Sequence, residues 1–347
     1  MTLIGILMTA GVLILMIVNQ QYQNHASIPT LSTIFVLSPK LNQILELMED
    51  CRLDSKLTND PQCMLVTGDT GAGKTSLIEY YHKEKPNLES EYASKIAILS
   101  TSLPESSTPI TAAQQLLYDL GDPFYSKSDN IIELTAKLVV LIKNCQVEMI
   151  IIDEFQHMIE FKTKKVLFRV ADWLKMLIVR TKVPIILFGL PYSELILQTN
   201  KQLAGRFLLR QNLEPFRIKL KANRNYFLSF LNAVDKVLPF ESSSNLTDQK
   251  ISKAIYVASK GNLRNLMVLI NYAVKRSLKQ GEIKLSVESL IYAADTLNIT
   301  AKNPFLLEDI DLSDIVEPSK NIGWETILEQ RNLAKKDIKL TIDDLFN

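Results

Sequence analysis

A glycine-rich loop of eight residues carries the clearest chemistry in the sequence. It follows an apolar segment, precedes a helical pattern that begins at Ser76, and reads Gly68, Asp69, Thr70, Gly71, Ala72, Gly73, Lys74 and Thr75. Glycines let a backbone wrap around an anion, and the helix N-terminus then points at phosphates. We expect Lys74 to reach the β- and γ-phosphates of ATP, the Thr75 hydroxyl to bind Mg²⁺, and Gly68 to Ser76 to surround the nucleotide as a Walker A loop.

Two adjacent carboxylates form a second candidate group. The apolar run from Met149 to Ile152 ends in Asp153 and Glu154. Sheets of α/β proteins present their ligands at the carboxyl ends of their strands. We expect Asp153 to hold Mg²⁺ through water and Glu154 to polarise the water that attacks the γ-phosphate, as in a Walker B motif. Loop and acids together predict an enzyme that hydrolyses ATP.

Two arginines are candidates for contact with developing phosphate charge. Arg206, in the run QLAGRF, comes shortly before the last expected strand of the sheet. Oligomeric ATPases place a cation there that reaches a neighbour's nucleotide, and Arg210 is the reserve candidate. Arg264, in the run GNLR, opens a helix and is expected to fold back onto the γ-phosphate. A plain surface role is the competing interpretation for both Arg206 and Arg264.

The residues after Glu154 and after the fourth expected strand are less specific. Gln156 and His157 follow on the same turn as the acids. His157 could sense the γ-phosphate or tune Glu154, but a lone histidine more often has a structural role, and the same holds for Gln156. The run FGLP at Phe188 to Pro191 offers no polar side chain to orient water, so Tyr192 or Ser193 are the candidate substitutes.

Short apolar runs alternate with helical patterns from Gln62 onward, which predicts a parallel sheet with crossover helices. The fold class is therefore α/β: a P-loop AAA+ domain with five parallel strands, helices on both faces, and a small all-helical lid after the sheet. Strands are expected at 63–67, 95–100, 148–152, 184–188 and 216–220. Helices are expected near 41–48, 111–120, 129–144 and 164–180, with lid helices at 225–237, 247–259, 263–279 and 287–297.

This pattern divides the chain into four parts. We expect an apolar extension over 1–26, the nucleotide-binding domain over 27–221, the helical lid over 222–298, and a tail over 299–347 that bears Trp324 and could dock a partner. The uncharged run Thr2–Val18 lies near the lower limit of about 17 residues for a membrane-spanning helix. An inner-membrane anchor and an extension that is dispensable, or that precedes the true start, are both open. A signal peptide is disfavoured because no Lys or Arg precedes the run.

Composition favours a folded protein without a global preference for charged partners. The 347 residues are 47% hydrophobic and 22% charged, with a formal net charge of +1. Any contact with nucleic acid must therefore come from a local patch. Cys51, Cys63 and Cys145 are odd in number and lack metal-ligand spacing, so we interpret them as reduced core residues of a cytoplasmic protein.

The motifs GDTGAGKT, IIIDEFQHM, PIILFGLP, QLAGRF and GNLRNL occur in an order that resembles the AAA+ transposition regulators of the TnsC and TniB family, roughly from Thr33 to Leu297. The resemblance implies an ATP-dependent protein that assembles as rings or filaments on duplex DNA and links a TniQ-like target selector to transposase subunits. ATP would license assembly, and hydrolysis would remove the protein from unsuitable sites. The apolar N-terminus and Leu190 depart from the family pattern.

The resemblance does not locate the DNA contact. The densest basic cluster of the nucleotide-binding domain comprises Lys162, Lys164, Lys165 and Arg169, with Lys127 as a weaker candidate. Such a patch would bind phosphates without reading sequence, although a solvated helix face explains it almost as well. Two other functions are open: a membrane-associated ATPase of the ExeA type, which acts in secretion, and an initiator or clamp-loader-like ATPase.

Overall fold

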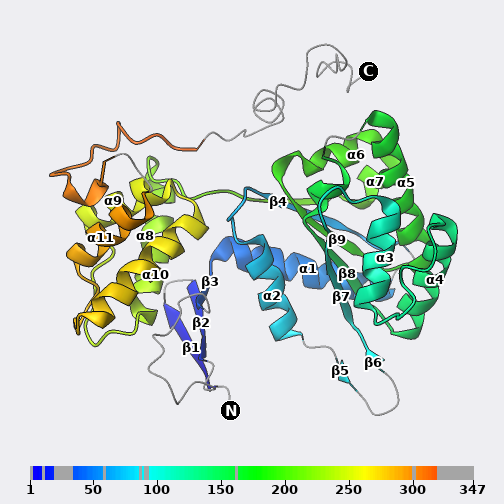
Figure 1. The fold of residues 1–347 in the computed structure, drawn as a ribbon, viewed down its shortest axis with the longest axis horizontal. Coiled ribbons are helices and arrows are strands. Elements are labelled where there is room, and N and C mark those ends of the chain that lie inside the picture. The colour runs from blue at the N-terminus through cyan, green and yellow to red at the C-terminus, as the bar shows by residue number, and fades with distance from the viewer. Residues whose placement is uncertain are drawn as a thin grey trace. The chain divides into compact units, whose positions relative to one another are not determined.

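The computed structural model describes residues 3–9, 12–18, 34–57, 60–85, 88–89, 94–160, 163–298 and 302–318. Its largest sheet has five parallel strands in the order β10-β4-β9-β8-β7 (Figure 1). Their bounds are β4 Met64–Gly68, β7 Ile98–Ser102, β8 Met149–Asp153, β9 Ile185–Gly189 and β10 Leu209–Leu213. Every residue of β4, β8 and β9 is buried, which explains their continuous apolar sequences.

Helices cover both faces of this sheet. In Figure 1, α1 and α2 lie on one side of the strands, whereas α3, α4 and α5 lie on the other. The bounds are α1 Pro39–Leu57, α2 Lys74–Glu84, α3 Pro109–Asp119, α4 Ile131–Asn144 and α5 Lys164–Thr181. Two short helices precede β10, namely α6 Leu195–Thr199 and α7 Lys201–Arg206, and the sequence analysis did not anticipate them. The predicted fold of parallel sheet and crossover helices is confirmed.

The fifth strand lies earlier in the chain than expected. The prediction placed it at Phe216–Leu220, but the structure forms it from Leu209–Leu213, which pairs with β4 at the edge of the sheet. Its exposed alternate residues, Arg210 and Asn212, hid it from a search for continuous apolar runs. The segment 216–220 also alternates, but Ile218 is instead buried in the core of the helical region.

Four helices follow the sheet: α8 Lys221–Val237, α9 Gln249–Ser259, α10 Leu263–Lys279 and α11 Val287–Leu297. They share one apolar core, centred on fully buried side chains such as Phe227, Tyr256 and Leu269. The segment 302–318, expected as the start of a tail, adds Phe305, Ile310 and Ile315 to this core.

Hydrogen bonds from backbone N–H groups to one side chain hold that segment in place. Glu317 Oε1 accepts hydrogen bonds from the backbone N–H groups of Ile218 and Lys219, both at 2.7 Å. The segment 302–318 is therefore part of the helical core rather than a free extension. Trp324, proposed as a docking residue, lies outside the described residues.

The chain divides into two compact units. One unit holds the N-terminal strands, the start of α1 to Gln43, the loop residues Gly71–Gly73, and the described residues from Glu214 onward. The other holds Ile44–Thr70 and Lys74–Leu213. In the first unit, β1 Leu3–Thr9, β2 Val12–Val18 and β3 Ile34–Leu37 form an antiparallel sheet. The apolar run Thr2–Val18 thus supplies two strands rather than one long helix. Within the described residues, no helix has the length and apolar character needed to cross a membrane.

The predicted core cysteines are only partly as expected. Cys51 and Cys63 are buried, and burial raises the pKa of each thiol to about 12, whereas Cys145 is half-buried. All three are free thiols. The two buried cysteines therefore act as small apolar side chains.

A cluster of charged side chains joins α1 to the helix that follows the glycine-rich loop. Arg52 lies between Glu49 on its own helix and Glu148 at the start of β8, and it forms an ion pair with each. Tyr81 of α2 donates a hydrogen bond to Glu49 Oε2 at 2.8 Å. Because α2 begins at Lys74, this cluster helps to fix the helix on which the phosphate loop ends.

The Glu49 carboxylate is expected to make stability depend on pH. The hydrogen bond from Arg52, with smaller contributions from Tyr81 and Lys85, lowers the pKa of Glu49 from 4.5 to about 2, although burial opposes the shift. A carboxyl group with a depressed pKa in the folded state stabilises the protein above its unfolded pKa, and this contribution is lost as pH falls towards 2. As pH falls from 7 through 4.5 to 3, the urea midpoint of the Glu49→Gln variant should therefore fall less than that of the native chain. Asp50→Asn removes an exposed carboxylate of the same helix, and its urea midpoint should change with pH as in the native chain. A native-like pH dependence of the midpoint in Glu49→Gln would refute the stabilising role of Glu49.

Candidate nucleotide-binding site

The glycine-rich loop connects β4 to α2, which is the arrangement that a phosphate-binding loop requires. Gly71 and Gly73 have φ angles of +80° and +93°, in the left-handed region that favours glycine. These two glycines therefore adopt backbone angles at which a residue with a side chain would be strained. The predicted contacts Thr70, Thr75 and Ser76 are exposed, and Gly71, Ala72 and Gly73 are half-exposed.

Lys74 lies at the first position of α2 and is 7% exposed. Its Nζ donates hydrogen bonds to the carbonyl oxygens of Gly68 at 2.7 Å and Asp69 at 3.1 Å. The ammonium group is thus held over the loop by backbone dipoles. Burial raises the pKa of the neighbouring Asp69, while the charge of Lys74 opposes this shift.

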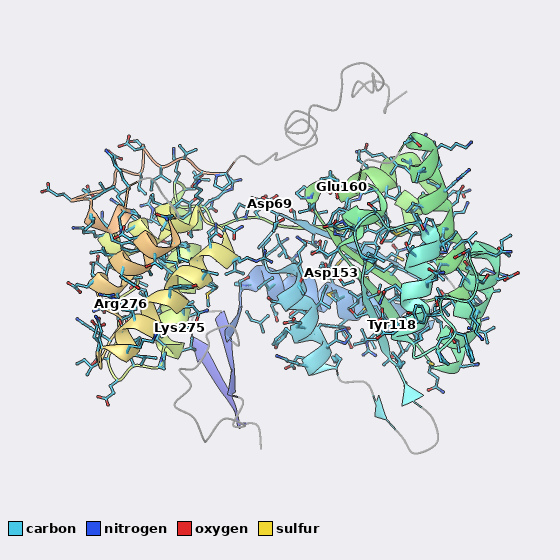
Figure 2. The ribbon with its side chains drawn as sticks, viewed as in Figure 1. Asp69, Tyr118, Asp153, Glu160, Lys275 and Arg276 are labelled. Atoms are coloured by element: carbon cyan, nitrogen blue, oxygen red, sulfur yellow. The ribbon has the colours of Figure 1, made fainter. Side chains whose placement is uncertain are left out.

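Thr75 and Asp153 come together although they are 78 residues apart in sequence. The Thr75 hydroxyl donates a hydrogen bond to Asp153 Oδ2 at 2.8 Å. Asp153 is the last residue of β8, is 4% exposed, and is labelled in Figure 2. Burial raises its pKa, although hydrogen bonds from Thr75 and from the Glu154 backbone oppose the shift. A hydroxyl beside a carboxylate is a donor set that suits Mg²⁺ with a nucleotide phosphate, so these residues fit the predicted metal ion.

Glu154 has a backbone conformation that is uncommon for its residue type. Its φ and ψ angles are 55° and 34°, in the left-handed region, and its side chain is 39% exposed. Such conformations cost about 1–3 kcal/mol and concentrate at functional sites. The strained turn separates the Glu154 side chain from Asp153 and presents it to solvent beside the end of β8.

Gln156 connects Glu154 to the neighbouring strand, a link that sequence analysis missed. Its Nε2 donates a hydrogen bond to Glu154 Oε2, and its Oε1 accepts one from the Leu190 backbone N–H at 3.2 Å. His157 lies farther away, with Nε2 at 4.0 Å from Glu154 Oε2 and Nδ1 at 3.6 Å from Glu160 Oε2. Of the candidate polar residues after β9, Ser193 is fully buried and Tyr192 is 5% exposed. The only sequence signal for the Gln156 link was its spacing from Glu154.

Arg206 lies at the end of α7, directly before β10. Its guanidinium forms an ion pair with Asp60, and its carbonyl oxygen accepts a hydrogen bond from Cys63 N–H at 2.8 Å. Arg210, the reserve candidate, lies on β10 and donates from Nε to the Phe207 carbonyl oxygen at 3.2 Å. Both arginines therefore lie next to the edge strand, and neither belongs to the loop and acid cluster of the same chain.

Arg264 lies near the tip of the loop, in the same compact unit as Gly71–Gly73. The Arg264 backbone N–H donates a hydrogen bond to the Gly71 carbonyl oxygen at 3.1 Å. A Cβ added at Gly71 would approach the Arg264 Cβ to 2.8 Å and the Asn262 Oδ1 to 2.7 Å. Gly71 therefore provides the close approach as well as the unusual backbone angle.

The candidate DNA-binding cations are described only in part. Lys165 and Arg169 are exposed, one turn apart on α5. Lys162 lies outside the described residues, as does the side chain of Lys164. Lys127 is stacked over the Phe124 ring, with Nζ 3.8 Å from the ring centroid.

Comparison with solved structures supports the fold assignment. The chain is similar to the ORC2 protein of Aeropyrum pernix in its ADPNP-ADP complexes, with a TM-score of 0.52, 14% identity, and coverage of 75% of this chain and 67% of that one. It is also similar to Cdc6p from Pyrobaculum aerophilum, with a TM-score of 0.53, 12% identity, and coverage of 74% and 67%. At these identities the likeness defines the fold alone, and it agrees with the P-loop AAA+ fold predicted from the sequence.

Comparison at the level of sequence identifies the family. No curated protein matches the chain. The family model described as "Bacterial TniB protein" matches residues 32–217, which is more than half of the chain and includes the loop, both acids and Arg206. The family and the fold together confirm the predicted class, a P-loop ATPase of the AAA+ type. The chain belongs to the bacterial TniB family and is an ATPase of the transposition-regulator type.

Proposed function

We propose that the protein is an ATP-dependent, DNA-binding regulator of transposition that oligomerises on duplex DNA. In this role it links a TniQ-like target selector to transposase subunits, and ATP hydrolysis controls its disassembly. The observation that carries the proposal is the joining of Lys74, Thr75 and Asp153 at one end of the parallel sheet in a chain of the TniB family.

In the proposed reaction, the chain's residues hold the nucleotide and direct one water molecule. The Lys74 ammonium, now bonded to loop carbonyls, turns to the β- and γ-phosphate oxygens. Thr75 directly and Asp153 through water would hold Mg²⁺, and this ion would supply neutralisation of charge on the phosphates. Glu154 orients the attacking water and accepts its proton. Arg264, beside the loop tip, is the proposed contact to the γ-phosphate, and Arg206 acts on the nucleotide of a neighbouring subunit.

The two other functions have less support. The match to ORC2 and Cdc6p is at 14% and 12% identity, which describes a shared fold and does not favour an initiator over a regulator. The family match, in contrast, covers residues 32–217 and favours the regulator. A membrane-associated ATPase of the ExeA type required a helical anchor at Thr2–Val18, where the structure has two strands.

Substitution of the two central side chains should separate binding from hydrolysis. Lys74→Ala removes the cation that reaches the phosphates, so we expect nucleotide binding to be lost. Glu154→Gln keeps the shape of the side chain but removes the base, so binding should persist while turnover falls by about 10²–10⁴-fold. Calorimetric titration with an ATP analogue and measurement of phosphate release check both expectations. Native turnover in Glu154→Gln would remove Glu154 from the mechanism.

Arg206 should act between subunits. We expect Arg206→Ala to bind nucleotide normally as an isolated subunit and to lose hydrolysis by about 10³–10⁵-fold on assembly. Addition of Glu154→Gln subunits, which bind nucleotide and retain Arg206 but do not hydrolyse ATP, should restore part of the turnover. Asp60→Ala, which breaks the ion pair but keeps the guanidinium, is the matched control and should remain active. Full turnover in Arg206→Ala alone would transfer the role to Arg210 or another cation.

The proposed DNA contact makes a prediction about salt. Log affinity falls linearly with log salt concentration, and each cation that neutralises a phosphate makes this slope steeper by about 0.9. Replacement of both Lys165 and Arg169 by alanine should therefore lower this slope by about 2, as measured by fluorescence anisotropy of a labelled duplex with an ATP analogue. Lys175→Ala is the control on the same helix, because Lys175 already donates to Gln202 Oε1 at 3.0 Å. An unchanged slope in the double variant would exclude this face of α5 as the DNA contact.

A further inference from the structure

The side chain of Gln156 occupies a position that the ATPase site does not otherwise explain. It follows Glu154 by two residues, lies in the short helix η2 Phe155–Met158, and is 4% exposed. A buried amide must satisfy its donors and acceptors or incur a cost of about 1–3 kcal/mol. Both of the polar atoms of Gln156 have partners, and those partners belong to different strand ends.

The orientation of the Gln156 amide follows from chemistry. The Leu190 backbone N–H can only donate, so the atom that faces it must be Oε1. The Nε2 group is then directed at Glu154 Oε2, where it donates a hydrogen bond. The amide therefore connects the carboxylate at the end of β8 to the backbone directly after β9.

The surroundings leave little room for another arrangement. A Cβ added at Gly189, the last residue of β9, would approach Gln156 Oε1 to 3.2 Å and Ser193 Oγ to 2.3 Å. Gly189 thus permits the close approach of the amide to the strand end. The Glu154 side chain is 39% exposed, so packing alone does not fix its direction. Gln156 supplies a hydrogen-bond partner.

We propose that Gln156 is a positioning residue that holds the Glu154 carboxylate at a fixed place relative to the end of β9. This inference rests on the proposed function, in which Glu154 orients the attacking water. Because Gln156 is anchored by the Leu190 backbone N–H, this contact does not need a polar side chain at position 190. A shift of about 1 Å in a catalytic group can lower the rate by about 100-fold, so the position of the Glu154 carboxylate directly affects turnover.

Two variants test the proposal in the full-length chain with MgATP. Gln156→Leu removes both hydrogen bonds. Gln156→Glu keeps an acceptor for Leu190 N–H, but it replaces the donor to Glu154 with an oxygen and adds a carboxylate charge beside it. We expect each to lower kcat by about 10- to 100-fold while the Kd for an ATP analogue changes by less than about 2-fold. Gln115→Leu is the matched control on α3, where Gln115 donates to Asp119 Oδ1 at 3.1 Å, and it should keep native kcat.

The outcomes separate this inference from the proposed function. Native kcat in Gln156→Glu would show that the donor to Glu154 plays no part and would overturn the proposal, even if Gln156→Leu fails to fold. A parallel loss of kcat and ATP affinity in both variants would indicate a merely structural role and would also overturn it. Failure of the native chain to hydrolyse ATP, in contrast, would overturn the proposed function itself.

Discussion

The site depends on one geometric constraint: parallel strands end at the same edge of their sheet. Because β4 and β8 run in the same direction, the loop after one and the acids after the other meet, although 78 residues separate Thr75 from Asp153. The strands that place them are buried along their full length, so the edge is held by the core. The polar groups at this edge are then satisfied by one another: Lys74 by loop carbonyls, Thr75 by Asp153, and Glu154 by Gln156.

The sequence predicted those parts of the fold whose physical pattern is local and unambiguous. Strands covered on both faces are apolar throughout, so β4, β8 and β9 were predicted within one or two residues. The edge strand β10 has an exposed face with Arg210 and Asn212, and only its two end residues are apolar, whereas the segment 216–220 alternates apolar and basic residues as an edge strand can. Local pattern could not decide between the two segments, because pairing with β4 is a long-range property.

The same distinction applies to the site. The loop and the acids carry their chemistry in consecutive residues, so their place at the strand ends could be predicted, whereas their nucleotide contacts stay predictions. The Arg206–Asp60 ion pair and the bond from Leu190 N–H to Gln156 join residues 146 and 34 positions apart, and no spacing rule indicates them. The packing of Phe305 and Ile315 on the helical core was likewise hidden in an acidic, proline-containing stretch that resembles a tail.

The central claim is that nucleotide at this strand edge controls assembly on DNA. Its most direct test is electron microscopy of the full-length chain with duplex DNA, compared with and without a non-hydrolysable ATP analogue. Rings or filaments should form on DNA only when the analogue is present. Nucleotide-bound particles that ignore DNA, or assemblies on DNA that form equally well without nucleotide, would contradict it.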